Sequence, residues 1–212
     1  MDSTAGPFAA WLAAMQRALR GEQGSDVPCN GCTACCTSSQ FVHIGADEVD
    51  TLAHIPPALL FPAPRAPRGN VLMGYDENGR CPMLGDAGCS IYEHRPRTCR
   101  TYDCRIFPAT GVVLDDHSKR AIAERAGRWR FDYPAEADRS EHEAVQATAT
   151  FVREHEDLLP DELVPANPTQ RAVLAIELHD ASRGRALEDG VEVLLSSLVR
   201  RGVEQSGSSS GS

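Results

Sequence analysis

Four cysteines lie within eight residues near the start of the chain, in the run Cys29-Asn30-Gly31-Cys32-Thr33-Ala34-Cys35-Cys36. Two-residue gaps allow a tight loop to turn successive sulfur atoms toward one point, and Gly31 relieves the backbone at the bend. This spacing is typical of tetrahedral zinc–thiolate sites and of iron–sulfur clusters. The run is too dense for chance packing of unligated thiols. We therefore expect all four cysteines to bind metal.

The order within this run leaves the type of metal centre open. The first three cysteines match the opening of the bacterial ferredoxin motif, but Cys36 follows Cys35 at once, whereas the ferredoxin motif has a gap of three residues. Neighbouring side chains diverge in extended backbone, so Cys35 and Cys36 reach one ion only if the chain bends there. A centre with two metal ions fits the pair as well as a single ion does.

A second group of cysteines follows, with gaps of 7, 9 and 4 residues between its members Cys81, Cys89, Cys99 and Cys104. Each of them alone could be a small buried hydrophobic residue. Beside the first group, a ligand role is the better interpretation. The eight cysteines then form two sites of four thiolates or one larger polynuclear site.

The second group lies in a locally basic segment. Residues 80–105 carry a net charge of +2, whereas the whole chain carries -9. A zinc ion with four thiolates has a net charge of about -2, and nearby guanidinium groups would stabilise it. We expect Arg95 and Arg100, on either side of Cys99, to assist cofactor binding in this way. A solvated basic helix face is the alternative.

Several motifs together resemble a known family. Besides the first run, these are Arg80-Cys81-Pro82-Met83-Leu84, Gly88-Cys89-Ser90-Ile91-Tyr92, Arg95-Pro96 and Cys99-Arg100. In this order they look like the YkgJ-type cysteine-cluster proteins, a family with a CxxCxxCC signature. The resemblance covers residues 28–107 and implies chelation of zinc or iron. It implies no particular reaction and does not extend to the second half of the chain.

Composition and charge exclude other classes. With 42% hydrophobic and 24% charged residues, the chain has a globular composition. We expect no nucleic-acid partner because of the net charge of -9, and no membrane span because no apolar run of about 18 residues occurs. Asp2 stands where a signal peptide carries basic residues, so we expect a cytoplasmic protein whose cysteines are thiols. His94, within the second group, is better interpreted as a hydrogen-bonded histidine than as a ligand.

Hydrophobic periodicity and turn residues predict the elements. A helix beginning at Pro7 would bury the stripe Phe8, Trp11, Leu12, Met15 and Leu19. Further elements are a strand at 40–44, short helices at 47–53 and after Pro96, a hairpin of 71–75 with 80–84 around Asn78-Gly79, and helices at 116–128, 134–157, 168–182 and 187–201.

These elements predict an α+β protein, in which a small, loop-rich cysteine region stapled by metal packs against a helical C-terminal half. The expected parts are an N-terminal amphipathic helix (1–26), a cysteine-cluster metal-binding domain (27–110), a helical region (111–203) and a flexible Ser/Gly tail (204–212). The leading hypothesis is a cytoplasmic protein that chelates zinc or iron through two groups of four cysteines. One alternative is an iron–sulfur enzyme or electron carrier; the other is a structural zinc module with a partner-binding helical region.

Overall fold

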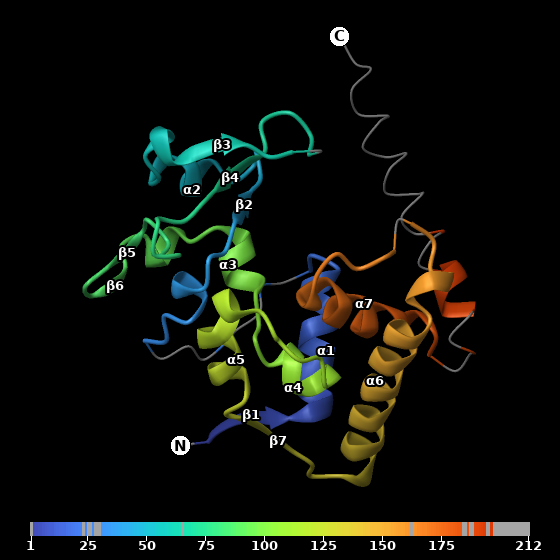
Figure 1. Cartoon of the computed structure of the whole chain (residues 1–212). Helices are drawn as coiled ribbons and strands as arrows, with labels where there is room; N and C mark the ends of the chain where they lie inside the picture. The colour runs from blue at the N-terminus through green and yellow to red at the C-terminus, as the bar shows by residue number, and fades with distance from the viewer. Residues whose placement is uncertain are drawn as a thin grey trace. The chain divides into compact units, whose positions relative to one another are not determined.

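The computed structural model describes residues 2–22, 24, 27, 31–64, 66–161, 163–183, 186, 189–193 and 196 (Figure 1). Its elements form a mixed α+β protein, which confirms the expected fold class. The chain divides into two compact units. The cysteine unit comprises the described residues of 17–104 and 114–129, and the helical unit comprises those of 2–16, 105–113 and 130–212. Neither unit is one continuous stretch of sequence.

The cysteine unit is made of short elements. In chain order these are η1 (Cys35–Thr37), β2 (Val42–Ile44), α2 (Val49–Ala53), η2 (Pro57–Leu59), β3 (Leu60–Pro62), β4 (Val71–Met73), β5 (Leu84–Gly85), β6 (Gly88–Cys89), η3 (Tyr92–His94), α3 (Arg97–Thr101), η4 (His117–Lys119) and α5 (Arg120–Ala126). The strand predicted at 40–44, the helix predicted at 47–53 and the short helix after Pro96 are therefore confirmed, each with shorter bounds.

A small antiparallel sheet in the order β2-β4-β3 supplies most of the core of this unit. Val42 and Ile44 are buried while His43 between them is exposed, as the alternation of a half-buried strand requires. Val42 and Leu60 both pair with Met73, which is almost fully buried. Ile55 and Ile91 complete the buried cluster, and two cysteines, Cys81 and Cys89, pack against it. The sheet thereby supports the second cysteine group.

The predicted hairpin of 71–75 with 80–84 is wrong in its pairing. The turn itself forms, because the Asp76 N–H donates to the Arg80 carbonyl oxygen at 2.9 Å. The strands do not pair because both edges of β4 are already occupied, by β2 and by β3. After the turn the chain instead bonds to the first cysteine run, and Leu84 starts a separate hairpin, β5 with β6. Within the proline-rich stretch 56–67, residues 57–62 form η2 and β3.

The helical unit contains β1 (Ser3–Pro7), most of α1 (Phe8–Leu19), α4 (Ile106–Thr110), most of β7 (Trp129–Asp132), α6 (Glu136–Glu154), η5 (Glu156–Leu158) and α7 (Pro168–Ala181). The helices predicted at 134–157 and 168–182 correspond to α6 and α7, and the one at 116–128 to η4 and α5. The helix predicted at 187–201 lies mostly, and the tail at 204–212 entirely, outside the described residues.

The N-terminal helix forms as the apolar stripe predicts, but it begins one residue later. Pro7 ends β1, which pairs with β7, and α1 follows from Phe8. Phe8, Trp11 and Leu12 are buried. The buried carboxylate of Asp138, at the start of α6, accepts a hydrogen bond from the Ala9 N–H at 3.0 Å, which satisfies a backbone donor at the start of α1.

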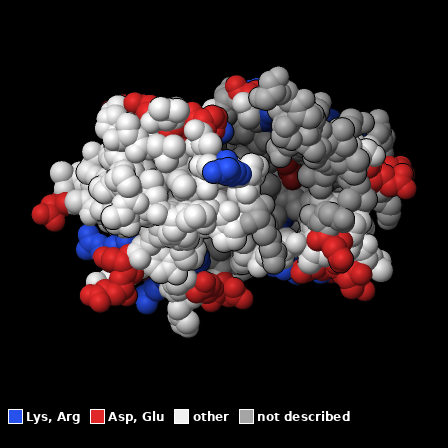
Figure 2. Space-filling view, turned by 90° about the horizontal axis from the view of Figure 1, so that it is seen from above, with Lys and Arg blue, Asp and Glu red and all other residues white. Residues whose placement is uncertain are grey.

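Two further observations concern the surface. None of the described helices is long and apolar enough to cross a membrane. On the face seen in Figure 2, the described acidic and basic side chains lie in small separate groups with uncharged residues between them.

Candidate metal centre

All seven cysteines that the structure describes line one cavity of the cysteine unit, with a volume of about 450 Å³. They are Cys32, Cys35, Cys36, Cys81, Cys89, Cys99 and Cys104. Cys29, the eighth predicted ligand, lies outside the described residues. No disulfide joins any two of the seven. Segments far apart in the sequence thus contribute cysteines to the lining of one cavity.

The first cysteine run is held as a tight turn. Gly31 has a φ of +79°, a left-handed conformation that glycine adopts without strain, as the predicted bend requires. Cys35 and Cys36 lie on η1, and the hydroxyl of the buried Ser38 donates back to the Ala34 carbonyl at 2.7 Å. The bend needed for the two adjacent cysteines is therefore present.

Lys119, on η4, holds the end of this turn from a distant part of the sequence. Its Nζ donates to the carbonyl oxygens of Ser38 and Ser39 at 2.7 and 2.9 Å. Partial burial lowers the pKa of this lysine. The bonds nevertheless use its charged form, since hydrogen bonds from an ammonium group are stronger than neutral ones.

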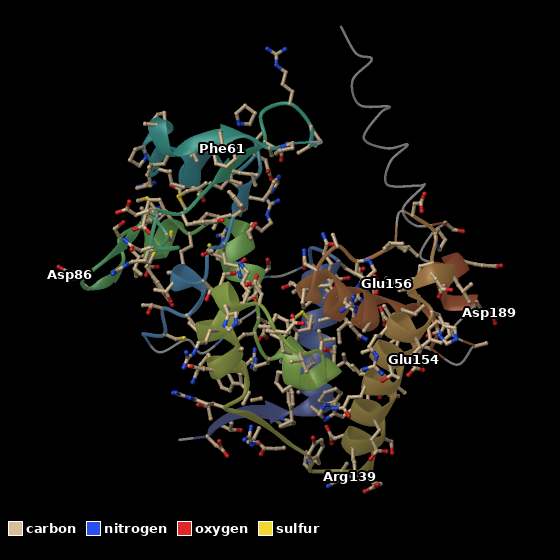
Figure 3. All side chains as sticks on the ribbon, in the orientation of Figure 1. Phe61, Asp86, Arg139, Glu154, Glu156 and Asp189 are labelled. Atoms are coloured by element: carbon tan, nitrogen blue, oxygen red, sulfur yellow. The ribbon has the colours of Figure 1, made fainter. Side chains whose placement is uncertain are left out.

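The backbone joins the two cysteine groups directly. The Cys81 N–H donates to the Cys36 carbonyl oxygen at 2.7 Å, and the Ser39 N–H donates to the Gly79 carbonyl oxygen at 2.9 Å. Cys89 is then placed by the short hairpin, in which it pairs with Leu84. Asp86, labelled in Figure 3, is at the turn of that hairpin and is exposed. The hairpin thus brings Cys89 back beside Cys81.

Cys99 is presented by α3, which is tied to the sheet and to the preceding loop. The Thr98 hydroxyl donates to the His43 carbonyl on β2 at 2.7 Å. The buried carboxylate of Glu48 accepts hydrogen bonds from the backbone N–H of Gly45 and of Arg97, so it satisfies a donor at the start of α3. These contacts fix the helix that carries the thiol.

Cys104 is the one buried cysteine among those described, and Trp129 of a later segment contacts it. The indole Nε1 of Trp129 donates to the Cys104 Sγ at 3.2 Å. The guanidinium of Arg125 lies 4.1 Å from the centre of the Trp129 ring, and Arg125 also lines the cavity. Sequence reasoning missed Arg125 and Trp129, because their positions within a predicted helical region carry no cysteine or spacing signal.

Four of the thiols interact electrostatically. Burial, together with the neighbouring Cys36, Cys81 and Cys89, raises the pKa of Cys99 to about 12. The residue is exposed to solvent as a whole, so the burial reflects the protein atoms packed around its thiol. Burial likewise raises the pKa of Cys81, with a smaller contribution from Cys89. Such thiols ionise together only if a positive charge offsets their repulsion, which a coordinated metal ion supplies.

The two arginines predicted beside the cofactor lie in different surroundings. Arg95 lines the cavity, donates from Nε to the Tyr92 carbonyl at 2.7 Å and lies 3.6 Å from the centre of the Tyr92 ring. Its charge lowers the pKa of Cys99. Arg100 is not among the described residues that line the cavity, and its guanidinium lies 3.9 Å from the Glu48 carboxylate. The assisting role of each toward a metal stays a prediction.

The donor set of the cavity fits a soft or borderline metal. Among the described lining residues, seven thiols and two thioethers outnumber the hydroxyl and amide groups, and none is a carboxylate or an imidazole. Thiolates select zinc, copper(I) and iron–sulfur centres, whereas magnesium and calcium require oxygen ligands. The donor set is therefore the one that thiolate metal sites use.

Comparison with known proteins identifies the same class. Residues 28–125 match the family described as "CxxCxxCC: Putative zinc- or iron-chelating domain". This segment is just under half of the 212 residues. The match ends at Arg125, near the end of α5. It therefore extends past the cysteine motifs and includes the segment that carries Lys119. Neither the curated proteins nor the solved structures contain a match to this chain.

Proposed function

We propose that the cysteine unit binds zinc or iron through thiolates of both cysteine groups. The ligands are drawn from Cys29, Cys32, Cys35, Cys36, Cys81, Cys89, Cys99 and Cys104. The observation that carries this proposal is the single cavity lined by all seven described cysteines. Reduced thiols of this kind persist in the cytoplasm, which is where we place the protein.

The number of thiols favours more than one metal ion. Four thiolates saturate a tetrahedral zinc ion, whereas seven described cysteines share this cavity. Two ions, or one polynuclear centre, use these ligands without leaving buried thiols unligated. The polynuclear form makes an iron–sulfur cluster the second candidate, because such a cluster needs cysteines that converge on one space from separate segments.

Arg95 is the basic residue best placed to assist. Its guanidinium is at the cavity, and its charge acts on Cys99. In the proposed site it stabilises the anionic metal–thiolate centre without coordinating the metal. Trp129 serves the same purpose at Cys104 by donating a hydrogen bond to the sulfur.

Elemental analysis and a visible spectrum of anaerobically purified protein test the proposal. We expect more than one equivalent of zinc or iron per chain. Zinc leaves the protein colourless, whereas an iron–sulfur cluster gives a broad visible absorption band that decides for the second candidate. Protein that is purified anaerobically, binds neither added zinc nor added iron and shows no band contradicts the proposal.

Serine variants test whether both groups ligate. Cys36→Ser and Cys99→Ser should each lower the metal-to-protein ratio. Thr98→Ser is the matched control, because it lies beside Cys99 at the same cavity and keeps its hydroxyl. If Cys99→Ser retains the wild-type ratio, the second group does not ligate and the two-group site is wrong.

A further inference from the structure

Three side chains able to bind a metal gather outside the cysteine cavity. Asp50 is on α2, His54 follows the end of that helix, and His94 is on η3. One donor atom from each lies within 4.8 Å of those of the other two. None of the three is among the described residues that line the cavity. The cluster is therefore separate from the thiolate site, although η3 also carries Tyr92, which does line the cavity.

The contacts within the cluster assign the ring protons. His94 Nδ1 lies 2.7 Å from Asp50 Oδ2, and His54 Nδ1 lies 2.8 Å from the backbone oxygen of Asp50. Both oxygens accept hydrogen bonds, so each Nδ1 carries its proton and each Nε2 keeps a lone pair when the ring is neutral.

The two rings are also held close to each other. Their centroids are 3.5 Å apart, and the ring planes are within 7° of parallel. The side chains are solvent accessible, at 40% for His54, 39% for His94 and 73% for Asp50. A cation can therefore approach from solvent, and the rings are able to turn out of the stack to meet it.

We propose that Asp50, His54 and His94 form a second, exchangeable site for a first-row divalent cation such as Zn²⁺. Two imidazoles and one carboxylate suit zinc and its neighbours better than magnesium or calcium. Three protein ligands leave coordination positions open to water. The site is consequently weaker than a closed thiolate centre and exchanges its ion with solvent.

Calorimetric titration of the full chain with Zn²⁺, under reducing conditions, tests the site. Wild type should bind one more equivalent than His54→Gln or His94→Gln, or bind that equivalent at least 10-fold more tightly. Asp50→Asn should weaken it in the same direction, because it removes the negative charge. His43→Gln is the matched control: His43 is an exposed histidine of the same unit and lies on β2.

The histidine variants also distinguish metal binding at this site from metal binding in the cysteine cavity. Elemental analysis after dialysis should give the same tightly bound metal in His54→Gln, His94→Gln and His43→Gln, whether or not the cavity is loaded. Equal unfolding midpoints establish that the variants fold. If all three histidine variants bind as many equivalents as wild type, with equal affinity, the second site does not exist. Loss of tightly bound metal in His94→Gln would place that histidine in the thiolate centre and would also overturn the proposal.

Discussion

Replacement of Trp129 by phenylalanine tests the proposed metal centre through a residue that is not a ligand. The indole of Trp129 donates to the Cys104 Sγ at 3.2 Å, and both residues are buried, with exposed fractions of 3% and 7%. Phenylalanine keeps an aromatic ring in contact range of Arg125 but has no N–H. If Cys104 is a metal-bound thiolate, the substitution removes one hydrogen bond to a charged sulfur.

The expected size of the effect follows from this geometry. A hydrogen bond to a charged group contributes about 1.5–3 kcal/mol, and burial leaves it weakly screened. Since about 1.4 kcal/mol corresponds to a factor of ten in affinity, Trp129→Phe should weaken metal binding roughly 10- to 100-fold. Loss of an outer hydrogen bond at known metal sites has a similar cost, about 10- to 100-fold.

The other tryptophan of the chain is the matched control. Trp11 is also buried, with an exposed fraction of 4%, and packs against Phe8 and Phe131 in the helical unit. Trp11→Phe removes the same atoms from a different core, so both variants should lower the free energy of unfolding. Only Trp129→Phe should lower metal affinity, measured by competition with a chromophoric chelator. Equal affinities in the two variants would refute the role of the indole at Cys104.

Three further predictions concern other contacts. Arg95→Gln removes a charge that lowers the pKa of Cys99. The Cys99 thiolate should then protonate at a higher pH on acidification, so the midpoint pH of metal loss should rise. Retained metal is measured against pH, and a curve that overlaps that of the exposed control Arg153→Gln would contradict the role of Arg95. Lys119→Met removes two hydrogen bonds to the first cysteine turn and should destabilise the cysteine unit by about 1–3 kcal/mol, measured by unfolding in denaturant. Arg120→Gln, which breaks an exposed ion pair within a helix, is the control and should change the stability much less. An equal loss in the two variants would refute the stabilising role of Lys119. Asp138→Ala leaves the N–H groups of Ala9 and Ala135 without their carboxylate acceptor, so it should destabilise the helical unit by about 2–4 kcal/mol without changing the metal content. The exposed control Glu143→Ala should change neither the stability nor the metal content. An Asp138→Ala variant as stable as wild type would contradict the capping role.

The elements that were predicted well are those with a strong local signal. The stripe from Phe8 to Leu19 predicts α1 because a helix of 3.6 residues per turn places these residues on one face. All of them are buried except Leu19, which is half-buried. Pro96 predicts the start of α3, since its fixed φ suits the beginning of a helix. The turn at Asn78-Gly79 was also correct, with Gly79 at a φ of +74°.

The elements that failed depend on competition between distant segments. A turn brings two strands together only if no other strand takes their edges, and here β2 and β3 occupy both edges of β4. Similarly, the pairing of Ser3–Pro7 with β7 has no local signal, because the partner strand lies far along the chain. Which strands pair along each edge depends on the whole sheet, so a short stretch of sequence does not predict it.

The same division between local and long-range determinants holds for the candidate metal centre. By itself the sequence determines the ligand chemistry, since residue types and close spacing in the run from Cys29 to Cys36 require a sulfur-rich turn, and Gly31 supplies its bend. Only the tertiary structure decides that Cys81, Cys89, Cys99 and Cys104 open onto the same cavity as this turn. It also decides that Trp129 adjoins Cys104, that Arg125 lines the same cavity and that His94 meets Asp50. The physical reason is that ligand type and turn geometry are local properties of the chain, whereas convergence depends on how the core closes around residues far apart in sequence.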